Sequence, residues 1–101
     1  MFSKESLDHW IAKALTFYLL RKMRHDVVTE FEITGLGQGD ILDLTTNTQY
    51  EIETVNNRNF HKRRVEQYKR IGVDVVVIAT NKLPRYIKDK IEVIMQNIRP
   101  D

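Results

Sequence analysis

The spacing of apolar residues changes along this chain, and each change marks a new element. From Ser3 to Arg24, apolar side chains return every three or four positions, which predicts a helix with one apolar face. We expect that face, including Trp10, to pack into the core. Its members are Leu7, Trp10, Ile11, Ala14, Leu15 and Tyr18.

The middle of the chain favours strands. Short segments bounded by turn-forming residues, a pattern typical of strands, cover Val27–Ile33, Asp40–Thr45 and Gln49–Val55. The first break, 35–39, contains three glycines and predicts a flexible turn that leads into the second strand. The second break, 45–48, predicts the turn of a hairpin between the two later strands.

Alternation along the third strand separates its residues into two sets. Side chains of a strand point to opposite faces in turn. We therefore expect Tyr50 and Ile52 to enter the apolar core, while Glu51 and Glu53 share the other face.

The second half of the chain predicts a helix, a strand and a helix. Phe60–Ile71 is a basic helical segment closed by Gly72. Val73–Ala79 is a β-branched run typical of a strand buried on both faces. Leu83 and Pro84 open a final helix, whose inward stripe comprises Ile87, Ile91, Ile94 and Ile98.

This order of elements, αβββαβα, predicts the fold class. A helix between the third and fourth strands returns the fourth strand parallel to the third. We therefore expect an α/β fold with a small mixed sheet covered by helices on both faces. The 101 residues suffice for a single domain over 1–101.

Composition narrows the setting of the protein. No apolar stretch approaches the roughly 20 residues that a membrane-spanning helix needs, so no membrane partner is expected. The N-terminus lacks the pattern of a signal peptide, which favours an intracellular, cytoplasmic protein. The chain has no cysteine, which excludes disulfides, thiolate catalysis and cysteine-type zinc sites.

Charge is unevenly distributed, although the net charge is only +2. Bases concentrate in the predicted second helix, and acids in the middle of the chain. A basic patch beside an acidic centre suits a protein that holds a polyanion next to a metal ion; the alternative is a set of solvated helix faces. The candidate nucleic-acid contacts are Lys13, Arg58, Lys62, Arg63, Arg64 and Gln67.

The acidic centre is the strongest chemical signal. The hairpin would place Asp40 beside Glu51 and Glu53, which makes three carboxylates with no obvious cationic partner. A hard divalent cation is the usual way to relieve repulsion in such a cluster. The pattern predicts a Mg²⁺ site, with Mn²⁺ as a substitute, and phosphodiester chemistry. The alternative for the two glutamates is a solvent-facing strand.

These elements and acids, taken in order, resemble the PD-(D/E)xK nuclease superfamily, whose members include restriction endonucleases and archaeal Holliday-junction resolvases. The resemblance covers nearly the whole chain and implies a restriction-endonuclease-like αβββαβα core. It implies Asp40 and Glu51 as the central metal ligands, with the Ile52 carbonyl as a third. An additional acid would come from Glu30, or from Glu5 on the first helix.

One position departs from the superfamily pattern. Where most relatives have a lysine that orients or deprotonates the attacking water, this chain has Glu53. The acid would accept the proton of that water or help to bind a second ion. The missing positive charge would then come from elsewhere, with Lys13, Lys62 and Arg63 as candidates.

The first helix adds a further candidate. Glu5, His9 and Lys13 follow one another at i, i+4 spacing, a pattern similar to the competence-related, CoiA-like branch of the superfamily. The resemblance makes His9 a contact to phosphate or to metal-bound water. A ladder of ion pairs on the helix surface is the alternative.

The leading interpretation is a Mg²⁺-dependent DNA endonuclease that hydrolyses phosphodiester bonds in a resolvase-like or repair-like function. One domain offers one metal site, so cutting both strands would require a homodimer. The alternative is a catalytically weak or inactive relative that binds branched or single-stranded nucleic acid through its basic helix. A third interpretation is a small α/β interaction module whose acids only decorate the surface.

Overall fold

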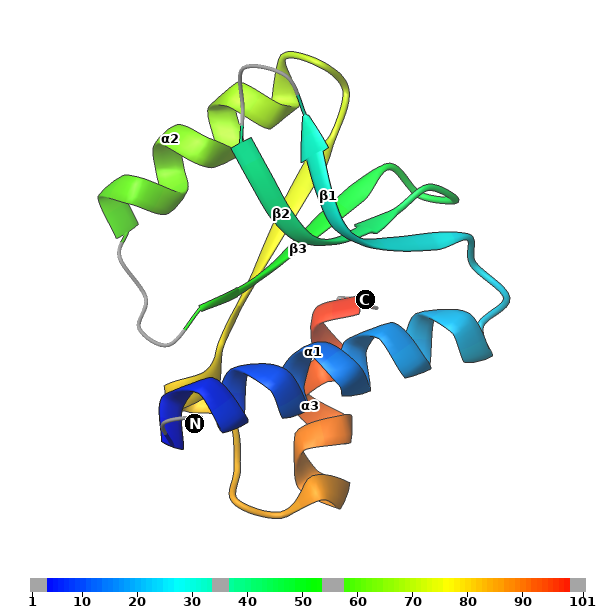
Figure 1. Ribbon diagram of the computed structural model, residues 1–101, viewed down its shortest axis with the longest axis vertical. Coiled ribbons are helices and arrows are strands. Elements are labelled where there is room, and N and C mark those ends of the chain that lie inside the picture. The colour runs from blue at the N-terminus through cyan, green and yellow to red at the C-terminus, as the bar shows by residue number, and fades with distance from the viewer. Residues whose placement is uncertain (1–3, 34–36, 54–57, 99–101) are drawn as a thin grey trace.

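The computed structural model confirms the expected α/β fold (Figure 1) and describes residues 4–33, 37–53 and 58–98. None of the helices in these ranges is both long enough and apolar enough to cross a membrane. The elements in chain order are α1 (Lys4–Lys22), β1 (Val27–Ile33), β2 (Gly37–Asp43), β3 (Thr48–Glu53), α2 (Arg58–Lys69), β4 (Asp74–Ala79), the short 3₁₀ helix η1 (Thr80–Lys82) and α3 (Ile87–Ile98).

The four strands form one mixed sheet in the order β1-β2-β3-β4. β1, β2 and β3 pair antiparallel, and β4 lies parallel to β3, as the crossover through α2 predicts. α1 and α3 lie on one side of the sheet and α2 on the other (Figure 1). β4 is an edge strand in which only Ile78 is buried, so the prediction of a strand buried on both faces is wrong.

The apolar core lies between the sheet and the layer formed by α1 and α3. Tyr50 and Ile52 of β3 are almost fully buried in it, which confirms the predicted alternation along this strand. The remaining buried members come from α1, β2, β4 and α3 and are Ala12, Leu19, Leu20, Ile41, Ile78 and Ile94.

α1 turns a different face to the core from the one that its apolar spacing predicts. Ala12 and Leu20 are fully buried, whereas Trp10 is 64% exposed, so the placement of Trp10 in the core is wrong. Apolar residues surround most of this helix, and spacing alone therefore fits more than one face. The packing of Leu19 and Leu20 against the core selects the face that is buried.

The two long helices before β1 and β4 end in the same kind of turn. Gly72, with φ of 80°, closes α2 as predicted. At the end of α1 the equivalent left-handed residue is Arg24, with φ of 66°. The amide of His25 then donates to the carbonyl of Leu20 at 3.1 Å, which satisfies a carbonyl of the last turn.

β2 begins at Gly37 rather than at Asp40, so the prediction of a flexible turn is wrong for Gly37 to Gly39. Gly39 pairs with Phe31 of β1, and a Cβ atom at this position would collide with the Phe31 ring. Glycine is therefore needed because an aromatic ring packs against the strand. Positions 35 and 36 of the expected turn lie outside the described residues.

α3 begins later than predicted. The helix starts at Ile87, because the segment before it is held in another conformation by Lys90, whose Nζ donates to the carbonyls of Pro84 at 2.6 Å and Arg85 at 2.8 Å. Ile87 is 56% exposed, so its predicted inward position is wrong. The other three isoleucines of the predicted stripe, Ile91, Ile94 and Ile98, do contact the core.

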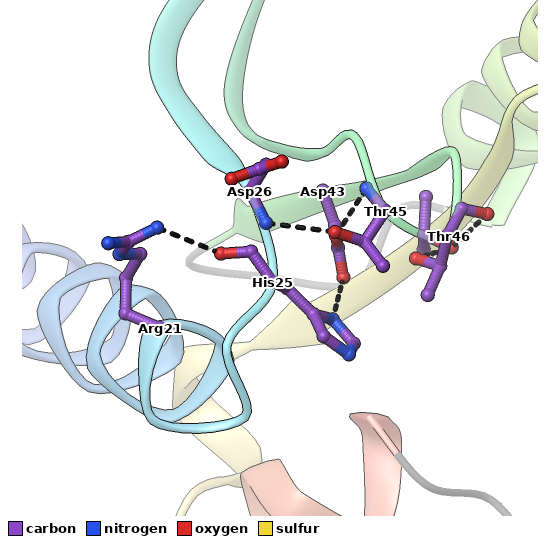
Figure 2. A network of polar contacts seen from close by, with 7 residues as sticks. Arg21, His25, Asp26, Asp43, Thr45 and Thr46 are labelled. Atoms are coloured by element: carbon purple, nitrogen blue, oxygen red, sulfur yellow. Dashed lines mark hydrogen bonds and ion pairs between the residues drawn. The ribbon is translucent and has the colours of Figure 1, made fainter.

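A polar network ties the end of α1 to the β2–β3 turn (Figure 2). The Asp43 side chain is fully buried, with Oδ2 at 2.6 Å from His25 Nδ1 and Oδ1 accepting from the amide of Thr45 at 3.0 Å. The hydroxyl of Thr45 accepts from the amide of Asp26 at 2.9 Å. Because these bonds link three segments, they fix the hairpin relative to α1.

The free energy of unfolding should fall at alkaline pH because of the Tyr50 hydroxyl. Burial, and to a smaller extent the charge of Asp43, raises the pKa of Tyr50 from 10.0 to about 12. Since the folded-state pKa is the higher one, the stabilisation is complete below pH 10 and is lost as the pH rises through about 12. We expect this group alone to lower the free energy of unfolding by about 2 kcal/mol over that interval.

Urea unfolding of the wild type and of Tyr50→Phe at a series of pH values measures this effect. The variant lacks the titrating hydroxyl, so its stability should fall less steeply between pH 10 and 12. Parallel curves for the two proteins would contradict the prediction.

Candidate functional site

Three of the predicted acids, Glu30, Asp40 and Glu51, lie on three adjacent strands of the sheet. β1 and β2 pair on both sides of Glu30 and Asp40, but these two residues do not pair, and Glu30 has a left-handed backbone with φ of 51°. The pairing of β2 with β3 ends at Ile41 and Tyr50, so Asp40 and Glu51 are the next residues along these strands. We call Glu30, Asp40 and Glu51 the acidic row.

Two acids of this row meet bases from α1. His9 Nε2 lies 3.5 Å from Asp40 Oδ1, and Lys13 Nζ lies 3.4 Å from Glu30 Oε1. The two bases are one helical turn apart, so they face the same edge of the sheet. His9 and Lys13 therefore contact sheet acids instead of only extending a ladder along the helix. The side chain of Glu5 lies outside the described part of the structure.

Asp40 also contacts the neighbouring strand. Its Oδ2 accepts a hydrogen bond from the amide of Ile52 at 2.9 Å. This bond lies just beyond Ile41 and Tyr50, the last pair between β2 and β3. Asp40 thus links α1, β2 and β3 through one carboxylate. The group of Ile52 that it contacts is the amide, whereas the resemblance implies the carbonyl as a metal ligand.

Glu51 is buried beneath α2 in an ion pair with Arg64. Only 4% of the Glu51 side chain and 17% of the Arg64 side chain are exposed. The Arg64 guanidinium also lies 5.5 Å from the centre of the Tyr68 ring, and its Nη2 donates to the Tyr68 hydroxyl at 3.4 Å. Burial raises the pKa of Tyr68 above 10.0, against the opposing effect of the Arg64 charge.

The basic partners correct the expectation that the carboxylates lack cations. That expectation is wrong for Asp40 and Glu51, because α1 and α2 supply a base to each. Arg64, predicted as a nucleic-acid contact, is buried against Glu51. Arg64 is thus the base of α2 that contacts an acid of the row, whereas Lys62 and Arg63 are exposed.

The remaining predicted residues lie around this centre. Glu53 ends β3, is half-buried and, by alternation, shares the face of Glu51. Lys62, Arg63 and Gln67 are exposed on α2. The side chain of Arg58 lies outside the described part of the structure.

Gln49 is a polar residue at the site that sequence reasoning missed. It is fully buried on the α2 side of β3, and neither Oε1 nor Nε2 has a hydrogen-bond partner within the described ranges. It precedes Glu51 by two residues and therefore shares its face. The available signal was alternation, since Gln49, Glu51 and Glu53 form one polar stripe.

The donor set of the acidic row suits a hard divalent cation, because carboxylate and carbonyl oxygens are the ligands that Mg²⁺ prefers. Among the described residues, however, no three His, Asp or Glu side chains are grouped closely enough to hold a metal ion together. Asp40 and Glu51 already contact His9 and Arg64. A bound ion would have to exchange with these bases for the same oxygens.

Comparison of the chain with family models, with curated proteins and with solved structures finds no match.

Removing the base that α2 directs onto Glu51 should destabilise the protein. Arg64→Ala takes away an ion-pair partner of buried Glu51, and an uncompensated buried charge costs about 3 kcal/mol or more. The double variant Arg64→Met with Glu51→Leu removes both charges and replaces them with apolar side chains. Its free energy of unfolding should therefore be restored to near that of the wild type. Urea unfolding measures both effects.

Arg63→Ala provides the matched control, because Arg63 is exposed on the same helix. Its free energy of unfolding should change by no more than about 0.5 kcal/mol. Equal effects at positions 63 and 64 would show that the ion pair does not hold α2 on the sheet.

Proposed function

We propose that this protein is a metal-dependent phosphodiesterase that acts on DNA. The observation that carries the proposal is the acidic row, in which three neighbouring strands each contribute one acid and Asp40 and Glu51 directly follow the last β2–β3 pair. Carboxylates on adjacent strands are suited to bind a divalent cation. The αβββαβα order with a parallel fourth strand adds support, since the resemblance implies that core.

The residues of the row would divide the chemistry among them. Asp40 and Glu51 would hold the ion, with the Ile52 carbonyl as a further ligand. Mg²⁺, when bound, supplies a Lewis acid for the phosphate and lowers the pKa of a water. Glu53, on the same face as Glu51, would accept a proton from the attacking water.

The bases of α1 would act on the substrate. His9 and Lys13 now contact Asp40 and Glu30, and both would be available to phosphate oxygens once those acids bind a cation. Moving a base from an acid to a phosphate keeps its charge paired throughout. The same helix would therefore hold the site together before the substrate binds and hold the substrate afterwards.

A cleavage screen tests the proposal directly. We expect the wild type with Mg²⁺ or Mn²⁺ to cut at least one of duplex, single-stranded, flap or four-way-junction DNA. Asp40→Asn and Glu51→Gln should each reduce the rate at least about a hundredfold. Asp74→Asn alters an exposed acid at the start of β4 and should leave the rate unchanged.

Circular dichroism and urea unfolding of each variant separate loss of chemistry from loss of folding. Absence of cleavage on every substrate with both metals would refute the phosphodiesterase assignment. So would a rate for folded Asp40→Asn equal to that of the wild type.

A second candidate function is nucleic-acid binding without hydrolysis. The specific observation that favours it is that each acid of the row contacts a base, His9, Lys13 or Arg64, without a metal ion. The exposed bases of α2 and of the turn after it would then provide the binding surface. Those within the described side chains are Lys62, Arg63, Lys69 and Arg70.

Salt dependence tests the contribution of α2. If Lys62 and Arg63 contact phosphates, Lys62→Ala with Arg63→Ala should reduce the slope of log affinity against log salt by about 1 per lost contact. Arg85→Ala with Lys88→Ala removes the same charge from exposed positions near the start of α3 and should leave the slope unchanged. Fluorescence anisotropy with a labelled oligonucleotide provides the affinities. Equal slopes for the two double variants would exclude α2 as the binding surface.

A further inference from the structure

An exposed apolar stripe runs along α1 on the side away from the core. Its successive members are three, four and three residues apart, which is the spacing of the a and d positions in a coiled-coil heptad. Leu7 is 50%, Trp10 64% and Phe17 36% exposed. We call the α1 stripe the set Leu7, Trp10, Ala14, Phe17 and the adjacent Tyr18.

The α1 stripe is large enough to form the centre of an interface. Aromatic side chains offer roughly 150–250 Å² each, so at these exposures the stripe presents apolar surface on the order of 400 Å². A stable interface buries about 800 Å² on each partner, much of it a polar rim. The stripe thus supplies the apolar centre that a dimer of this size needs.

A hollow next to the stripe provides a complementary shape. Its volume is about 250 Å³, and it lies between α1 and β1. Trp10 and Phe17 are projecting side chains of the stripe and also line this hollow. A twofold interface requires a surface that is complementary to itself. The lining residues are Trp10, Lys13, Ala14, Phe17, Thr29 and Glu30.

The charges at the two ends of α1 determine the orientation of such a pair. Asp8 lies near the beginning of the helix, whereas Arg21 and Lys22 occupy its last turn. Antiparallel pairing sets the acidic end of one helix against the basic end of the other and also opposes the helix dipoles favourably. Parallel pairing would place like charges together at both ends.

We propose that α1 forms the interface of a homodimer, in which two copies pair antiparallel through the α1 stripe with the twofold axis near Ala14. The small side chain of Ala14 allows close approach at the axis, and Trp10 and Phe17 of each copy enter the hollow of the other. This inference concerns the assembly alone and does not depend on the proposed phosphodiesterase activity. Because Lys13 and Glu30 line the hollow, the acidic rows of both copies would flank the interface.

Sedimentation equilibrium of the full chain without DNA or metal tests the dimer. We expect a reversible monomer–dimer equilibrium, with a blue shift of tryptophan emission at the same concentrations, since Trp10 is the one tryptophan of the sequence. Phe17→Glu should weaken association at least about a hundredfold. Tyr86→Glu changes a more exposed aromatic residue outside the stripe and should leave association unchanged.

Cross-linking tests the orientation, because the sequence has no cysteine of its own. Under mild oxidation Ala14→Cys, at the axis, should form a disulfide-linked dimer, whereas Leu7→Cys and the exposed control Glu92→Cys should not. Efficient cross-linking of Leu7→Cys would overturn the antiparallel arrangement. A chain that stays monomeric at all concentrations would overturn the dimer, as would a monomer whose tryptophan emission shifts only on adding single-stranded DNA.

Discussion

The buried ion pair between Glu51 and Arg64 determines how the second face of the sheet is closed. α2 is strongly basic, and Tyr68 is its one buried residue within the described side chains, so apolar packing alone gives this helix little hold on the sheet. A carboxylate buried on the strand needs a cation within reach, and this requirement fixes the rotation of α2. Since α2 is also the crossover between β3 and β4, the parallel edge of the sheet depends on the same contact.

The two faces of the sheet are therefore held by different forces. On the side of α1 and α3, the packing is apolar and centred on Tyr50 and Ile52. On the side of α2, buried Gln49 and Glu51 make the contact polar. A polar face that is shielded from water gives stronger electrostatic interactions than the surface would. If a metal ion replaced Arg64 as the partner of Glu51, the electrostatic effect on neighbouring groups would therefore be larger here than at the surface.

Three faces of α1 have different surroundings. Leu19 and Leu20 face the core, His9 and Lys13 face the acidic row, and the α1 stripe faces solvent. A change in the position of α1 would therefore affect the core, the site and the proposed dimer interface together. The network of Asp43, His25 and Thr45 fixes the end of this helix against the hairpin and so limits such a change (Figure 2).

The sequence by itself determined the order of the elements, the alternation that buries Tyr50 and Ile52, and the end of α2 at Gly72. These features depend on local periodicity and on the conformational freedom of one residue, both of which can be read from neighbouring positions. The tertiary structure alone decided which face of α1 is buried, why Gly39 must be glycine, and which base neutralises Glu51. Each of these depends on a side-chain contact between different elements, which local periodicity does not specify. A helix with apolar residues around most of its surface likewise carries no local signal that selects one face.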